Sequence, residues 1–246
     1  MSEIDFTVRS TSPEWMDDFS ITDDRLIKAL DELRLVNRLL GGYSSTLSVL
    51  IPALRAANGP VRILDVGAGV GDLAEVIALW AVSQPSPVDV QIVATDANPA
   101  TVEYARQSLA RRLPTNAAAL VNAEVADATN LPYGDNEFDV VMASMFLHHF
   151  DDITAATVLA SMNRVARRGI IVSDLQRHPV AYHGFRALAT LTGACDMVRH
   201  DGPISVLRGF TRQELTHIAH RAGIATTGPQ WRWAFRWLLS TVPNAL

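Results

Sequence analysis

The sequence predicts an α/β fold in which helices cover both faces of a doubly wound, mostly parallel sheet. Short apolar runs with strand character alternate with helical patterns along most of the 246 residues. The run at 138–144 is apolar on both sides, as a central parallel strand requires. A glycine-rich turn at 67–71 joins the first strand to a helix, which is typical of α/β proteins that bind nucleotides.

Apolar periodicity and end signals define the elements in order. Asp23 and Asp24 mark a helix start, and Thr211 with Glu214 forms the capping box of a late helix. The sequence at 13–18 predicts only a short turn or the start of a helix. Helices are expected at 24–40, 45–57, 73–80, 100–112, 152–167 and 211–222. Strands are expected at 61–64, 88–94, 119–126, 138–144, 170–172, 224–231 and 233–240, with three tryptophans on one strand face at 231, 233 and 237.

The spacing of the glycines limits which class of ligand the turn can bind. Three glycines follow Asp65 as G-x-G-x-G, whereas a dinucleotide site has G-x-G-x-x-G. No lysine follows as in a phosphate loop. An acidic residue directly before the turn suits a cationic or zwitterionic ligand better than a pyrophosphate. Asp96 ends the second strand, where a carboxylate can accept hydrogen bonds from both hydroxyls of a ribose.

Two adjacent histidines follow the fourth strand, at the sheet edge where doubly wound proteins bind ligands. On an extended chain His148 and His149 cannot both face the cleft, so we expect one of them to be structural. No metal site is expected, because Asp151 and Asp152 are more typical of a helix start. A segment at 176–209 mixes apolar residues with a few polar ones, which suits a pocket for a small, partly aromatic ligand. Its candidate pocket residues are His183, Arg186, Met197 and His200.

Composition limits the partners. The formal charge of −5 and the absence of a lysine or arginine run disfavour nucleic acid and an anionic membrane. One cysteine forms no internal disulfide, and no signal-peptide core or membrane-spanning run is present, so we expect a cytoplasmic protein. We divide the chain into an N-terminal helical cap (1–44) and a main domain (45–246). Arg34, Asn37 and Tyr43 lie where such a cap could meet a ligand.

These motifs together resemble the class I S-adenosylmethionine-dependent methyltransferases of the small-molecule type. The resemblance rests on the segment 65–71, on Asp96 and Asp127, on the fourth strand and on two closing strands. Shorter strings at 36–42, 146–150 and 199–208 resemble a bacterial subgroup associated with aromatic polyketide and phenolic metabolism. The family implies a Rossmann-like, seven-stranded sheet with an antiparallel last strand. The Asn-Pro-Pro-Tyr motif of amino-directed methyltransferases is missing, since 144–147 read Ser-Met-Phe-Leu.

The resemblance implies S-adenosylmethionine as cofactor and O-methylation of a small phenolic or hydroxyquinone metabolite. The expected cofactor-binding residues are Asp65, Gly67, Ala68, Gly69, Asp96, Ala97, Asp127, Ala128 and Met145. A phenol ionises near pH ~10, so a histidine base is apt at neutral pH. The candidate bases are His148 and His149, with His183 and His200 as pocket alternatives; His149 is also a substrate-binding candidate.

Three alternatives stay open at this point. The acceptor atom can be a ring carbon of an aromatic or quinone metabolite, because the same residues serve both reactions. The chain can also be a cofactor-binding subunit without catalytic activity. The oligomeric state is open, and a homodimer is compatible with the sequence.

Overall fold

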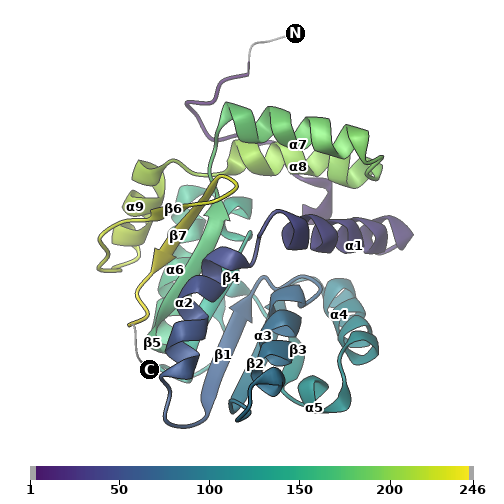
Figure 1. Ribbon diagram of the computed structural model, residues 1–246. Helices are drawn as coiled ribbons and strands as arrows, with labels where there is room; N and C mark the ends of the chain where they lie inside the picture. The colour runs from purple at the N-terminus through teal and green to yellow at the C-terminus, as the bar shows by residue number, and fades with distance from the viewer. Residues whose placement is uncertain (1–3, 244–246) are drawn as a thin grey trace.

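In the computed structural model, which describes residues 4–243, seven strands form a single sheet between helices (Figure 1). The strand order is β3-β2-β1-β4-β5-β7-β6; β7 pairs antiparallel with both β5 and β6, and the other four pairs are parallel. The strands are β1 (Val61–Val66), β2 (Val90–Asp96), β3 (Val121–Val125), β4 (Phe138–Ser144), β5 (Ala166–Leu175), β6 (Gln230–Arg232) and β7 (Arg236–Ser240). The predicted Rossmann-like fold is thereby confirmed.

The helices form two layers because the central strands bury both faces. On β4, Val141 and Ala143 face the cluster that includes α6, whereas Val140 and Met142 face the cluster that includes α2 and α3. No helix among residues 4–243 has the length and apolar character needed to cross a bilayer. The helices are α1 (Asp24–Leu39), α2 (Ser44–Arg55), α3 (Asp72–Ser83), α4 (Pro99–Arg112), α5 (Thr115–Ala118), α6 (Asp152–Val165), α7 (Pro179–Leu191), α8 (Asp196–Arg208) and α9 (Arg212–Arg221).

The strand order reverses between β1 and β4, which lie side by side in parallel. From β1 the chain proceeds to β2 and β3 on one side, and from β4 to β5 on the other. A doubly wound sheet opens a crevice at such a switch point, beyond the carboxyl ends of its strands. The glycine turn after β1 and the short 3₁₀ helix η3 (Leu147–His149) after β4 therefore face one another across this crevice.

Helices α1, α7 and α8 lie across the carboxyl ends of the strands (Figure 1). Leu26 and Leu30 of α1 pack with Met197 and Val198 of α8 onto Val70 of the glycine turn. Residues 4–21, which we call the N-terminal strap, contain the 3₁₀ helix η1 (Trp15–Asp17) and run along α8. The crevice is thus covered by elements from both ends of the sequence.

Three arginines anchor the strap. Arg177 donates to the carbonyls of Phe6 and Thr7, and its own side chain is fully buried. Arg9 donates to the carbonyls of residues 148 and 150 and pairs with Asp152 at 2.6 Å. The third is Arg208, which joins the strap to η3 and is described with the site. These contacts fix the strap against η3. The domain boundary between residues 44 and 45 stays a prediction.

The last two strands differ from the expected ones. β6 has three residues, and a tight turn follows in which Ala234 and Phe235 have positive φ angles of 59° and 57°. Trp231 and Trp237 are therefore register partners on two strands, and the expectation that three tryptophans share one strand face is wrong. The sequence lacks the glycine or asparagine that usually marks such a hairpin turn, so the pattern gave no signal for it.

Candidate functional site

A cavity of about 720 Å³ lies at the switch point, beneath α1 and the strap. Its floor is the glycine turn, and its sides come from the ends of β2, β3 and β4. Its apolar residues come mainly from the strap, from α1 and from η3 with its flanks. Lining residues are Met16, Asp17, Phe19, Leu26, Leu30, Leu33, Arg34, Asn37, Gly67, Ala68, Gly69, Val70, Asp72, Asp96, Ala97, Asn98, Thr101, Ala126, Asp127, Ala128, Ser144, Met145, Phe146, His149 and Phe150.

The glycine turn leaves bare backbone in the cavity. Gly69 has a φ of +53°, which favours glycine, and no atom lies within 4 Å of the position that a Cβ would take. A Cβ on Gly67, in contrast, would lie 2.1 Å from the Phe146 ring. The turn therefore requires glycine at 67 for packing against η3, and at 69 it offers open space for a ligand.

Asp65, at the end of β1, is a buried carboxylate without a complete set of partners. It is 2% exposed, and its Oδ2 has no hydrogen-bond partner in the described part of the chain. Burial raises the pKa of Asp65 well above its usual range, and the nearby charge of Asp72 adds to the rise. Because an orphaned buried oxygen is costly, this geometry fits a site that a cationic group completes.

Asp96 turns its carboxylate toward the same turn from the end of β2. Its Oδ2 accepts from the amide of Gly69 at 3.2 Å, and its Oδ1 accepts from the amide of Asn98 at 2.9 Å. Burial raises the pKa of Asp96, although these amides and the charge of His149 oppose the rise. Each carboxylate oxygen can accept a further hydrogen bond, so a diol in the cavity has acceptors within reach.

All the predicted cofactor residues except Asp65 line the cavity, including Ala68, Ala97, Asp127, Ala128 and Met145. Asp127 accepts from the amide and hydroxyl of Thr129, both at 2.8 Å, which places the buried Ala128 in the 3₁₀ helix η2 (Ala128–Asn130). Met145 has a positive φ of 56°, a conformation that costs a non-glycine residue about 1–3 kcal/mol. Such strain is common where a backbone is shaped around a ligand.

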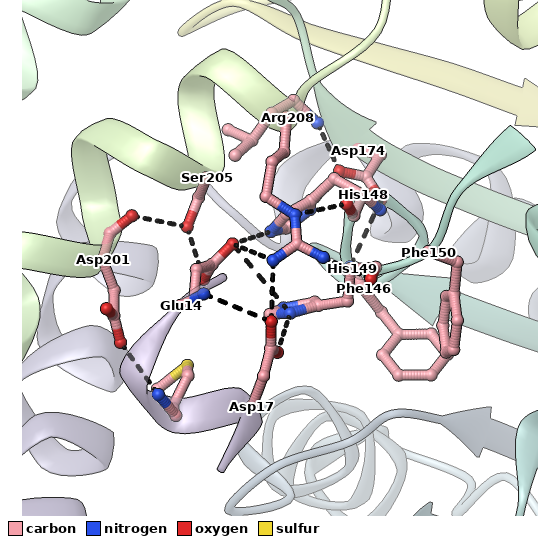
Figure 2. A network of polar contacts seen from close by, with 12 residues as sticks. Glu14, Asp17, Phe146, His148, His149, Phe150, Asp174, Asp201, Ser205 and Arg208 are labelled. Atoms are coloured by element: carbon pink, nitrogen blue, oxygen red, sulfur yellow. Dashed lines mark hydrogen bonds and ion pairs between the residues drawn. The ribbon is translucent and has the colours of Figure 1, made fainter. Parts of the chain in front are cut away.

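The two histidines have different surroundings, as Figure 2 shows. His148 is 3% exposed and its Nδ1 lies 2.7 Å from Oδ1 of Asp174, at the end of β5. His149 lines the cavity, and its Nδ1 lies 2.7 Å from Oδ1 of Asp17 in the strap. Within residues 4–243, no hydrogen bond occupies Nε2 of His149. His149 is thus the histidine of the pair that lines the cavity, whereas His148 does not.

The strap meets η3 in a charged network (Figure 2). Arg208 of α8 donates to Asp17 at 2.7 Å and to the carbonyls of both histidines. Glu14 is 3% exposed and accepts from the Ser205 hydroxyl at 2.8 Å. Asp201 accepts from the amides of Trp15 and Met16 at 2.8 and 3.1 Å, so it caps η1.

Four residues predicted to serve the substrate lie outside the cavity lining. His183 and Arg186 are exposed on α7, and the Arg186 guanidinium lies over the Tyr182 ring. Met197 is buried between α8 and α1. His200 stacks on Trp15, with ring centroids 4.1 Å apart, and contacts Asp201. Their proposed substrate roles are therefore not supported by position in this cavity.

Sequence reasoning missed the strap residues Met16, Asp17 and Phe19, which line the cavity. The local sequence predicts a turn there, but nothing in it indicates contact with residues more than a hundred positions away. We expected Arg34 and Asn37 to lie where the N-terminal cap could meet a ligand, and both residues of α1 line the cavity. Arg34 pairs with Glu75 at 3.0 Å, and Arg112 pairs with the same carboxylate at 2.9 Å.

Glu14, His148 and His149 place potential metal ligands within 4.8 Å of one another. Oε1 of Glu14 lies 3.9 Å from Nε2 of His148 and 4.0 Å from Nδ1 of His149. Nδ1 of His149 already contacts Asp17, and the Arg208 guanidinium lies 3.6 Å from the same glutamate oxygen. Because a guanidinium supplies positive charge where a metal ion would lie, we do not propose a metal here.

We expect His148→Ala to destabilise the fold rather than act on chemistry directly. Asp174 is fully buried, and burial would raise its pKa, but the charge and hydrogen bond of His148 hold the pKa below the usual range. Removing one partner of a buried pair costs about 3–5 kcal/mol, and the amides that still reach Asp174 favour the lower figure. Chemical denaturation measures the loss, and an unchanged unfolding free energy contradicts this structural role.

Comparisons with known proteins agree with this geometry. Residues 63–169, which run from β1 into β5, match the family described as "Methyltransferase domain". Magnesium protoporphyrin IX methyltransferase from Synechocystis, solved with bound S-adenosylhomocysteine, has the same fold with a TM-score of 0.56 and 16% identity. That similarity covers 82% of this chain and 83% of the Synechocystis chain.

Curated relatives are similar over part of their length. An O-methyltransferase from Penicillium expansum is 32% identical over 48% of this chain and 40% of its own. A demethylmenaquinone methyltransferase from Deinococcus radiodurans is 33% identical over 64% of this chain and 60% of its own. A ubiquinone/menaquinone biosynthesis C-methyltransferase from Cupriavidus taiwanensis is 29% identical over 55% and 51%. The chain thus spans about half the length of these relatives.

Proposed function

We propose that this chain, whose residues 63–169 match the methyltransferase domain family, is an S-adenosylmethionine-dependent O-methyltransferase of a small phenolic or hydroxyquinone metabolite. The observation that carries the proposal is that one cavity is lined both by the glycine turn and by His149. The relatives named as an O-methyltransferase and as quinone methyltransferases agree with a small aromatic acceptor.

The residues at the strand ends fit the cofactor. Asp65 would face its cationic part, since Oδ2 of Asp65 is buried and unpartnered among the described residues. Asp96 would accept from the ribose hydroxyls, and Asp127 with the Ala128 amide would receive the adenine. The backbone of Gly67, Ala68, Gly69, Ala97 and Met145 would complete the contact surface. When bound, S-adenosylmethionine supplies a methyl group that its sulfonium has already activated.

The chain's own task is to align the acceptor and to remove its proton. His149 would accept the hydroxyl proton at Nε2, leaving an oxyanion directed at the methyl group. General-base assistance of this kind contributes about 10²- to 10⁴-fold, and alignment of the reacting atoms contributes further. His148 is 3% exposed and, like His200, does not line the cavity, so position favours His149 as the base.

The acceptor half of the cavity favours a flat apolar ring. Its wall consists of carbon side chains from the strap, from α1 and from the flanks of η3, namely Met16, Phe19, Leu26, Leu30, Leu33, Phe146 and Phe150. The one arginine in the lining, Arg34, is paired with Glu75. A site of this kind binds an aromatic compound with few charged groups better than an anionic substrate.

Methylation at carbon is the second candidate, because a relative is named as a quinone-biosynthesis C-methyltransferase. His149 would serve either reaction, since an ionised phenol is nucleophilic at oxygen and at its ring carbons. A cofactor-binding subunit without activity is a further alternative. A homodimer, a cytoplasmic location, the cap at 1–44 and the pocket segment at 176–209 stay predictions.

The test is mass spectrometry of the purified protein with S-adenosylmethionine and a panel of resorcinols, naphthols and hydroxyquinones. We expect a product that is one methylene heavier, with fragments that place the methyl on oxygen. A methyl on carbon would support the second candidate. No product across the panel, with S-adenosylhomocysteine still bound in calorimetry, would favour the inactive subunit.

A further inference from the structure

We infer that Asp17 of the N-terminal strap is a positioning residue for His149: it sets which ring nitrogen carries the proton and leaves Nε2 as the base. The inference rests on the proposed function, because it takes His149 as the base. It adds a residue from a segment outside the methyltransferase domain match, which begins at residue 63.

The geometry places Asp17 between the imidazole of His149 and the guanidinium of Arg208. Its Oδ1 lies 2.7 Å from Nδ1 of His149, and its Oδ2 accepts from Nη1 of Arg208 at 2.7 Å (Figure 2). The strap cannot rotate away locally, because Asp201 accepts from two of its amides and Ser205 donates to Glu14. The carboxylate of Asp17 is therefore held in one orientation toward the imidazole.

The contact determines the tautomer. An ionised carboxylate only accepts hydrogen bonds, so Nδ1 of His149 must carry the proton that lies between them. In neutral His149 the lone pair is then on Nε2, the nitrogen without a hydrogen bond among residues 4–243. Burial would raise the pKa of Asp17, but the hydrogen bonds and charges of His149 and Arg208 lower it far below the usual range, so Asp17 is ionised at neutral pH.

Charged groups from every neighbouring element act on the ring. Asp17 and Glu14 face it from the strap, Arg208 from α8, and Asp174 and Asp96 from β5 and β2, while His148 lies beside it. Burial lowers the pKa of His149, but the bond to Asp17 and the charges of Glu14 and Asp17 outweigh it, and the net pKa is raised. Removing the Asp17 charge should therefore lower the pKa of His149.

The experiment compares Asp17→Asn with Glu14→Gln. Both are acidic strap residues near His149, but only Asp17 is bonded to it, and Glu14 is 4.0 Å away. In nitrogen-detected NMR of the protein with S-adenosylhomocysteine, the signals of His149 are assigned by their loss in His149→Gln. We expect wild type and Glu14→Gln to hold the proton on Nδ1, and Asp17→Asn to shift it toward Nε2 with a lower pKa.

With an acceptor found by the panel, Asp17→Asn should lower kcat about 10- to 100-fold with an unchanged affinity for S-adenosylhomocysteine. The base works unprotonated, so the rate rises with pH through the pKa of His149, and this rise should move to lower pH in Asp17→Asn. A merely structural role for Asp17 would lower the rate without moving the rise. The control is Asp18→Asn, which should leave the rate unchanged. Asp18 is an exposed neighbour whose side chain accepts from the amide of Ser20, and it does not belong to the cavity lining.

Two results overturn the inference. One is an unchanged tautomer and pKa of His149 in Asp17→Asn, and the other is an equal tautomer shift in Glu14→Gln. The NMR measurement uses no acceptor, so it remains decisive if the panel yields no product. A failure of the proposed function is therefore distinguishable from a failure of this inference.

Discussion

Replacing His149 with glutamine should lower kcat by about 10²- to 10⁴-fold, the usual contribution of a general base. Glutamine keeps polar atoms near Asp17 but cannot accept a proton at neutral pH. The glycine turn and Asp96 are untouched, so the affinity for S-adenosylhomocysteine should change little. Turnover is measured by product mass at saturating acceptor, and affinity by calorimetry.

Two further variants make this test specific. His217→Gln, on the exposed side of α9, is the control for replacing a histidine and should keep full activity. His200→Gln tests the histidine that stacks on Trp15 outside the cavity, and we expect at most a small effect. Loss of turnover in His200→Gln with normal turnover in His149→Gln would reverse the assignment of the base.

The parts of the site that could be predicted follow from short-range patterns and one topological rule. Asp65 and Asp96 lie at the carboxyl ends of β1 and β2, and Asp127 follows β3; parallel strands place these ends at one edge of the sheet. Local caps were equally readable, since Thr211 and Asp23 accept from the amides that their sequence positions predict. The seven-stranded sheet with its antiparallel last strand was expected from the family resemblance.

The sequence predicted that one of His148 and His149 is structural, but it did not predict which one. The expectation that one histidine is structural agrees with the contact of His148 with Asp174. Asp174 ends β5, the parallel neighbour of β4, so this contact was implicit in the strand order. The expectation assumed an extended chain, whereas the two residues lie in the 3₁₀ turn η3, with their ring centroids 4.4 Å apart.

The strap could not be predicted, because its contacts are charge pairs between distant segments. Asp17 and His149 are 132 positions apart, and Asp17 and Arg208 are 191 apart. Neither pair leaves a periodic pattern, and each residue alone is typical of a solvated surface. The 176–209 segment was expected to form a substrate pocket. Its residues Asp201, Ser205 and Arg208 instead contact the strap and do not line the cavity.

Replacing Asp96 with alanine should weaken the binding of S-adenosylhomocysteine by about 10²-fold or more. Hydrogen bonds to a charged group contribute about 1.5–3 kcal/mol each, and a ribose offers two hydroxyls to this carboxylate. The change also removes the acceptor of the Gly69 amide, which loosens the turn that forms the cavity floor. Both effects act on the cofactor, so kcat at saturating cofactor should change less than the dissociation constant.

The control for this prediction is Asp89→Ala, an exposed residue just before the amino end of β2, far along the strand from Asp96. Asp96→Asn keeps the shape and one acceptor oxygen, so it separates loss of charge from loss of the turn. We expect calorimetric affinity to fall in the order Asp89→Ala, Asp96→Asn, Asp96→Ala.

Because the pKa of Asp96 is raised by burial, wild-type affinity should also weaken as pH falls through that pKa, and Asp96→Asn should lack this pH dependence. The ribose assignment is contradicted if Asp96→Ala binds S-adenosylhomocysteine within about threefold of the wild-type affinity. Such a loss is well below that expected from losing even one hydrogen bond of this kind, and Asp96 would then only support the turn.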